Sequence, residues 1–307
     1  MFKKFKLFTV EKLTWSETGA LWKDTITGFL SGNGFFHGAA LSYYTIFALI
    51  PIIYLSILIF GQFIGQENMV FIIKSILTEQ VGIEDVSGIL QFLNKIDFES
   101  GSFVLKVIGI VSLIFTSTAL FASLRNSINT FYGIEAYQHE KRGKAILQTV
   151  IQRLISIGLL AAFGLILMLS YFAQLLIMSI GKDFLNELTS YQAFIVEILQ
   201  HGVVLISNVI IFFFIFKFLN NGKVYWKFAL AGSFVTAVLT YFGHMGIKYY
   251  LTNFFFAKNG GIAGSLLIIL AFVYYSSQII FFGAKFTAVF AQKSGRPIED
   301  EVKINSL

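Results

Sequence analysis

The fold class is decided by residues 34–65, which read GFFHGAALSYYTIFALIPIIYLSILIFGQFIG. Apart from His37, no residue in this stretch carries a formal charge. About 20 apolar residues suffice to cross the hydrocarbon core of a bilayer. The sequence therefore predicts a transmembrane helix here. Gly38 and Ser42 lie on one face of it, where their small side chains allow another helix to approach closely.

The composition of the whole chain is that of an integral membrane protein. Of the 307 residues, 56% are hydrophobic and 13% are charged, and the mean hydropathy is +0.75. These values overrule the two soluble domains that the length alone would suggest. The chain contains no cysteine, which excludes disulfides and Cys-ligated zinc.

Five further apolar runs follow, and each is long enough to cross a bilayer. They lie at about 101–123, 148–180, 194–219, 226–251 and 262–292. Together with the first helix they predict an all-α polytopic membrane protein, with six transmembrane helices in residues 34–292.

The remaining segments are predicted to lie at or outside the membrane surface. Residues 1–33 interleave lysines with phenylalanine and tryptophan, which is typical of a cytoplasmic amphipathic helix at the membrane surface. The connection 66–100 is acidic, and its apolar residues recur at helical spacing in 70–77 and 86–93. Two short interfacial helices are expected there. Residues 293–307 form a short polar tail.

Lysine and arginine are concentrated on one side of the predicted spans. They gather in the N-terminal segment, in the loops after the second and fourth spans, and in the tail. Because cytoplasmic loops carry an excess of these residues, both termini are expected in the cytoplasm. We therefore interpret the net charge of +6 as topology and expect no nucleic-acid partner.

Two spans carry polar side chains in the outer half of the membrane, where a charge costs at least about 2.5–3.5 kcal/mol. They are Glu197, His201 and Asn208 on one face of the fourth span, and Tyr241, His244 and Lys248 on one face of the fifth. We expect these faces to meet as a pocket, with Glu197 paired to Lys248 and His201 near His244. Alternatively, Glu197 and Lys248 snorkel to the interface and the histidines are satisfied core donors.

A second candidate site lies at the cytoplasmic ends of the helices. Its members are Arg125, Asn126, Asn129, Arg153 and Lys285. If these basic groups converge, they are suited to anionic lipid headgroups or an anionic solute. The alternative is that they anchor helix ends and enforce topology.

A third set of residues is suited to bending or gating. Pro51 removes a backbone donor and leaves the Phe47 carbonyl without its usual partner, so a kink or a packed neighbour is expected. Gly260 and Gly261 interrupt the helix before the last span, and Gly264 follows one turn later. These glycines permit gating, or they form a loop and a close packing point.

Three segments carry a family resemblance. They are AALSYYTIFALIP at 39–51, STALFASLRNSINTFYGIE at 117–135, and GGIAGSLLIILAFVYYSSQIIFFGAKFTAVFA at 260–291. In order and spacing they resemble the YihY/BrkB family of bacterial inner-membrane proteins, historically labelled ribonuclease BN. The segments are similar to its proline-bearing first helix, its SLRN-type end of the second helix and its final GAE-type segment.

The resemblance implies a six-helix protein of the bacterial inner membrane, linked to virulence, serum resistance and envelope physiology. Transport of lipid or lipopolysaccharide-related molecules is among the activities proposed for the family. The chain departs from the family pattern at Lys285, where many members look to have Glu after Gly-Ala, so no acidic role carries over to that position.

The ribonuclease label is disfavoured by the residues themselves. Metal-dependent hydrolysis needs clustered His and Asp ligands, whereas the four histidines are scattered at positions 37, 139, 201 and 244. No soluble basic domain offers exposed aromatics to RNA. We expect no enzymatic activity, cofactor or metal, and favour a transporter of a lipid or anionic solute. The alternative is a non-transporting scaffold or regulator of envelope biogenesis; the substrate and the oligomeric state are left open.

The predicted topology can be tested by tagging. A tag near Glu84 is expected on the opposite side of the membrane from tags at either terminus, because one span separates that loop from the N-terminal segment. Accessibility of each tag in intact cells measures the side. A cytosolic Glu84 loop, or an odd number of crossings, would contradict the six-span arrangement.

Overall fold

The computed structural model describes residues 15–81, 103–134, 158–159, 162–179, 190–254 and 261–300. Nearly all of these residues are helical. The helices are α1 (Trp15–Ser31), α2 (Gly34–Ile64), α3 (Gln66–Ser75), the π-helix η1 (Ile76–Val81), α5 (Phe103–Tyr132), the helix Ala162–Ser179, α7 (Ser190–Phe218), α8 (Trp226–Asn253) and α9 (Gly261–Lys293). Two short strands, β1 (Gly222–Lys223) and β2 (Glu299–Asp300), pair antiparallel.

Several helices have the length that a membrane crossing requires. Four of those described are also apolar enough: Ala162–Ser179, Phe194–Phe218, Trp226–Leu251 and Ala263–Lys293. Helices α2 and α5 contain 31 and 30 residues and exceed the length of a span as well. The expected all-α class with several membrane-crossing helices is confirmed, and the total of six crossings stays a prediction.

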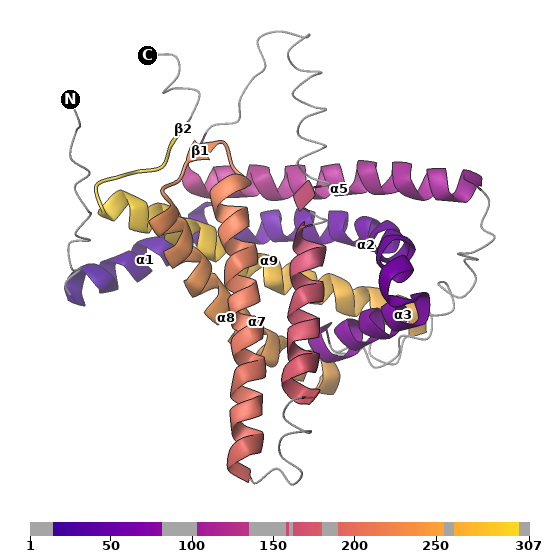
Figure 1. Ribbon diagram of the computed structural model, residues 1–307. Coiled ribbons are helices and arrows are strands. Elements are labelled where there is room, and N and C mark those ends of the chain that lie inside the picture. The colour runs from indigo at the N-terminus through magenta and orange to yellow at the C-terminus, as the bar shows by residue number, and fades with distance from the viewer. Residues whose placement is uncertain are drawn as a thin grey trace, which may run out of the picture.

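Helix α9 is the centre of the structure, because it contacts α1, α2, α5, α7 and α8. Figure 1 shows α2 lying alongside α5, with α7 running at a steep angle to both. Helix α1 packs on the C-terminal part of α9. There Lys293 Nζ lies 2.7 Å from Asp24 Oδ2, and the ring of Trp22 lies 5.3 Å from that of Phe286.

Helices α8 and α9 approach each other closely through two Gly-x-x-x-Thr segments. A Cβ atom at Gly232 of α8 would collide with Thr287 Oγ1 of α9, and one at Gly283 of α9 would collide with Thr236 Oγ1 of α8. Each threonine hydroxyl donates to the glycine carbonyl one turn earlier on its own helix, at 2.7 and 2.8 Å. Two backbones thus pack tightly while both buried hydroxyls remain hydrogen-bonded.

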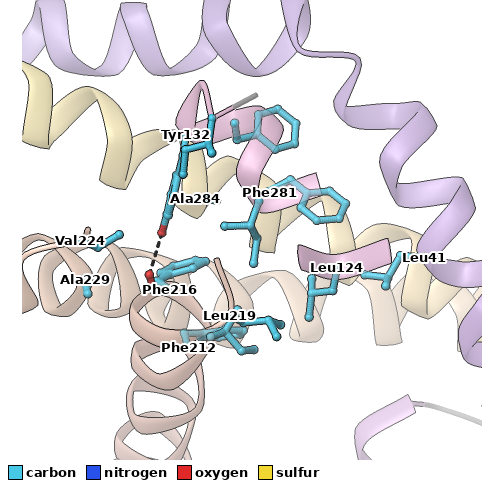
Figure 2. Packing of buried hydrophobic residues seen from close by; sticks show 14 of the residues in the cluster. Leu41, Leu124, Tyr132, Phe212, Phe216, Leu219, Val224, Ala229, Phe281 and Ala284 are labelled. Atoms are coloured by element: carbon cyan, nitrogen blue, oxygen red, sulfur yellow. Dashed lines mark hydrogen bonds between the residues drawn. The ribbon is translucent and has the colours of Figure 1, made fainter. Parts of the chain in front are cut away.

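The largest buried cluster lies where α5, α7 and α9 meet (Figure 2). Phe131 of α5, Phe216 of α7 and Phe281 of α9 are almost fully buried there. The rings of Phe131 and Phe281 stack at 5.6 Å, an arrangement worth about 0.5–1.5 kcal/mol beyond the burial of apolar area. These phenylalanines fix the relative positions of three helices.

The first half of the acidic connection packs against the helix bundle. Ile73 of α3 and Leu77 of η1 are buried with Ile57, Leu251 and Ile268 of α2, α8 and α9. Ile76, which the helical spacing would place on the same face, is exposed. The chain becomes a π-helix at that residue, and the wider turn changes the face that each side chain occupies. The second expected helix, at 86–93, lies outside the described residues.

Two details differ from the sequence-based expectations: the end of α5 and the presence of a strand in the tail. Helix α5 continues to Tyr132, beyond the end of the apolar run near 123. Arg125 and Asn129 lie within it, four positions apart, as the sequence indicated. Helix α2 is continuous through Pro51, and the kink or packed neighbour expected there stays a prediction. The tail contributes β2, and strands of two residues leave no periodic pattern in a sequence from which to predict them.

The contact between α8 and α9 predicts a sharp difference between two glycines. Gly283→Ala is expected to destabilise the protein by about 1–3 kcal/mol, because its methyl group meets a β-branched threonine that cannot swing away. Gly246→Ala on α8 is the control, since nothing lies within 4 Å of its Cβ position. Thermal unfolding in detergent measures both, and equal unfolding temperatures for the two variants would contradict the packing.

Candidate functional site

The C-terminal end of α5 is tied to the loop between α7 and α8. Asn129 is buried, and its Oδ1 accepts a hydrogen bond from the backbone N–H of Asn221 at 3.0 Å. The buried hydroxyl of Tyr132 donates to the carbonyl of Phe216 at 3.1 Å, as Figure 2 shows. Lys217 Nζ donates to the carbonyl of Val224 and closes the loop. These bonds hold the ends of α5 and α7 together.

Arg125 lies on the same face of α5 as these two anchoring residues, four positions before Asn129 and seven before Tyr132. One turn earlier on this face, the ring of Phe121 lies 6.2 Å from that of Phe163, so the face is turned toward the helix Ala162–Ser179. The Nε atom of Arg125 is buried and has no hydrogen-bond partner within the described residues. The guanidinium therefore carries a donor that the described part of the chain does not satisfy.

The other members of the expected cytoplasmic cluster are dispersed. Asn126 is exposed, and Lys285 lies against Gly28 of α1, where its Cε atom occupies the space that a Cβ would take. No hydrogen bond or ion pair between described residues joins Lys285 to Arg125 or Asn129. Arg153 lies outside the described residues. Of the described basic groups, Arg125 thus lies on α5 and Lys285 lies between α1 and α9.

The outer polar residues meet only in part. Glu197 Oε1 lies 3.7 Å from His201 Nε2 on the same helix, with side chains 67% and 53% exposed. A charged contact so exposed contributes little stability even when His201 is protonated. The ring of His201 lies 5.5 Å from that of Tyr241, so the faces of α7 and α8 touch at this point. Among the described residues Glu197 contacts His201, and no ion pair joins it to Lys248, which is exposed.

His244 does not lie beside His201. Its Nε2 is 3.1 Å from Ser276 Oγ, and its ring lies 4.7 Å from that of Phe272, both on α9. Helix α8 contacts both α7 and α9, and these contacts of His244 are with α9. Asn208 is half-buried on α7.

The expected gating residues are placed as follows. Gly261 begins α9, and Gly264 is buried one turn later. Gly260 lies outside the described residues. The helical backbone around Pro51 is continuous.

Sequence reasoning gave no role to a buried polar contact among α2, α5 and α9. His37 Nδ1 lies 2.9 Å from Ser127 Oγ, and its ring lies 5.6 Å from Phe131 and 6.0 Å from Phe281. The Ser127 hydroxyl also lies 2.8 Å from the Ser123 carbonyl. When it donates to that carbonyl, it accepts from an Nδ1–H of His37. A lone histidine near the start of a span was the available signal.

The fold and these polar groups define an α-helical polytopic membrane protein with an arginine, Arg125, whose buried Nε has no partner among the described residues. The chain belongs to the virulence factor BrkB family, whose model matches residues 25–304. The resemblance carried by the three segments is therefore confirmed.

Known relatives are UPF0761 membrane proteins. One from Pseudoalteromonas translucida (strain TAC 125) is 23% identical over 266 residues, covering 86% of this chain and 82% of the relative. One from Alkalilimnicola ehrlichii is 24% identical and covers 84% and 55%, and one from Rhodospirillum centenum is 22% identical and covers 87% and 56%. The chain thus spans just over half the length of the latter two. No solved structure matches it.

The anchoring role of Asn129 can be separated from the general chemistry of the α5 end. Asn129→Ala leaves the Asn221 N–H without its acceptor and is expected to cost about 1–3 kcal/mol of stability. Asn126→Ala, one turn earlier and exposed, is the matched control and is expected to have no effect. Unfolding in detergent measures both, and an unaffected Asn129→Ala protein would contradict the anchor.

Proposed function

We propose that this protein is a six-span permease of the bacterial inner membrane that moves a lipid or an anionic envelope-related solute. Six crossings with both termini in the cytoplasm are supported by the lengths of α2 and α5 and by the Lys and Arg bias of the loops. The helices do not all pack parallel to one another, since α7 runs at a steep angle to α2 and α5 (Figure 1). The packing angles are therefore no part of the support for six crossings. No enzymatic step is part of the proposal.

The observation that carries the proposal is the state of Arg125. A cation inside a membrane-spanning helix is costly and is normally paired with another protein group. Arg125 has a buried Nε with no hydrogen-bond partner within the described residues. Guanidinium groups present several donors that fit the oxygens of phosphate and carboxylate. An anionic substrate that reaches this face of α5 would supply the missing acceptor.

The hydrogen bonds of Asn129 and Tyr132 support the same role. They hold the α5 end against α7 and against the loop that follows it. A cation on a rigid helix keeps its position when an anion approaches, and such preorganisation lowers the cost of binding. Arg125 thus lies on a segment of α5 that hydrogen bonds hold to α7 and to the loop after it.

A scaffold remains the second candidate because of a different feature. Tyr43, Tyr44 and Phe47 form an exposed aromatic cluster on α2, with the Tyr43 and Phe47 rings 4.9 Å apart. A contiguous aromatic face suits a partner helix as well as lipid. This feature favours assembly with another membrane protein.

Transport can be tested with the purified protein in liposomes. Lipid scrambling and anion flux are measured for the native chain, for Arg125→Gln and for Lys223→Gln. Arg125→Gln is expected to lower the rate at least about tenfold, because a charge-assisted contact is lost. Lys223→Gln removes the same charge from an exposed position in β1 and is expected to retain the rate.

Glu197→Gln in the same assay tests the outer set, and loss of activity would place Glu197 on the transport route. Vesicles without either activity would contradict the permease. Inert vesicles together with a stoichiometric membrane partner that is lost on Tyr43→Ala would instead support the scaffold.

A further inference from the structure

Helix α1 presents three different faces. Leu21, Thr25 and Phe29 are buried against the helix bundle, whereas Trp22, Ile26 and Leu30 form an exposed apolar face, and Lys23, Asp24 and Thr27 lie on the polar remainder. A helix with a protein face, an apolar face and a polar face fits the boundary between lipid tails and headgroups. Helix α1 therefore combines a face packed against the bundle, including α9, with two faces suited to that boundary.

Lys285 reaches α1 through a notch made by Gly28. The Cε atom of Lys285 takes the place of a Cβ there, and its Nζ lies 3.2 Å from the same point. On α1, the carboxylate nearest to Gly28 in sequence is that of Asp24, and its Oδ2 lies 2.7 Å from Lys293 Nζ. Lys285 itself has no ion pair or hydrogen bond with any described residue. The half-buried ammonium of Lys285 thus lies beside α1 without a carboxylate partner among the described residues.

We propose that Lys285 binds the phosphate of an anionic phospholipid in the leaflet that contains α1. Lysines beside a membrane attract anionic headgroups, and the ammonium has three donors for phosphate oxygens. The apolar face of Trp22, Ile26 and Leu30 offers the acyl chains a neighbouring surface. Helices α1 and α9 therefore offer a cation to the lipid phosphate and an apolar surface to its acyl chains.

This lipid site does not depend on transport at Arg125. It predicts an equilibrium affinity in the purified protein, whereas the permease proposal predicts a rate across a bilayer. An inactive transporter with an intact lipid preference, or the reverse, would separate the two proposals.

The test uses Trp22 as a local reporter. Trp15→Phe and Trp226→Phe leave it as the single tryptophan of the full-length protein. Brominated phosphatidylglycerol in mixed micelles is expected to quench Trp22 at about fivefold lower mole fraction than brominated phosphatidylcholine. Lys285→Met should abolish this preference, and Lys285→Arg should keep it. Gly28→Ala should weaken it while retaining the charge, because the methyl group displaces the lysine.

The control is Lys223→Met, which removes one charge from an exposed strand and should leave the preference unchanged. Unaltered Trp22 emission in detergent without brominated lipid shows that α1 remains docked in each variant. The proposal is overturned if the native protein has no preference, if Lys223→Met removes it equally, or if added inorganic phosphate abolishes it. The last result would identify free phosphate as the ligand.

Discussion

The structure depends on how closely α9 approaches its neighbours. Lipid tails are as apolar as leucine, so burial of apolar area does little to drive two membrane helices together, and dispersion between closely packed backbones has to do it. The Gly232–Thr287 and Gly283–Thr236 contacts provide that approach for α8 and α9. The hydroxyls of Thr236 and Thr287 donate to carbonyls of their own helices. Thr240 Oγ1, one turn further along α8, is buried without a partner among the described residues.

Glycines on the other helices extend this principle around α9. Gly38 of α2 receives the side chain of Gln278, and Gly28 of α1 receives that of Lys285. In both places a missing Cβ lets a long polar side chain lie across a neighbouring backbone. Gln278 Nε2 donates to the Tyr274 carbonyl of its own helix, and its Oε1 is buried without a partner among the described residues. The close contacts are therefore steric, and polar capacity remains unused beside them.

The sequence predicted the bounds of the helices well and the contacts between side chains of different helices poorly. Helices α2, α7, α8 and α9 begin and end within a few residues of the apolar runs because a bilayer requires a minimum length of apolar residues. Glu197 and His201 were correctly assigned to one face of one helix. The partner of His244 is Ser276 of α9, which a face assignment cannot reveal because α8 contacts two helices.

The sequence by itself determined that the chain is an all-α membrane protein and which family it belongs to, because hydropathy and segment order are properties of the chain alone. Only the tertiary structure decided which polar groups have partners. It joined Asn129 to Asn221 by a hydrogen bond, placed Lys285 against Gly28 and paired Asp24 with Lys293. Helical periodicity fixes the direction in which a side chain points, but the packing angle and register of two helices decide what it meets.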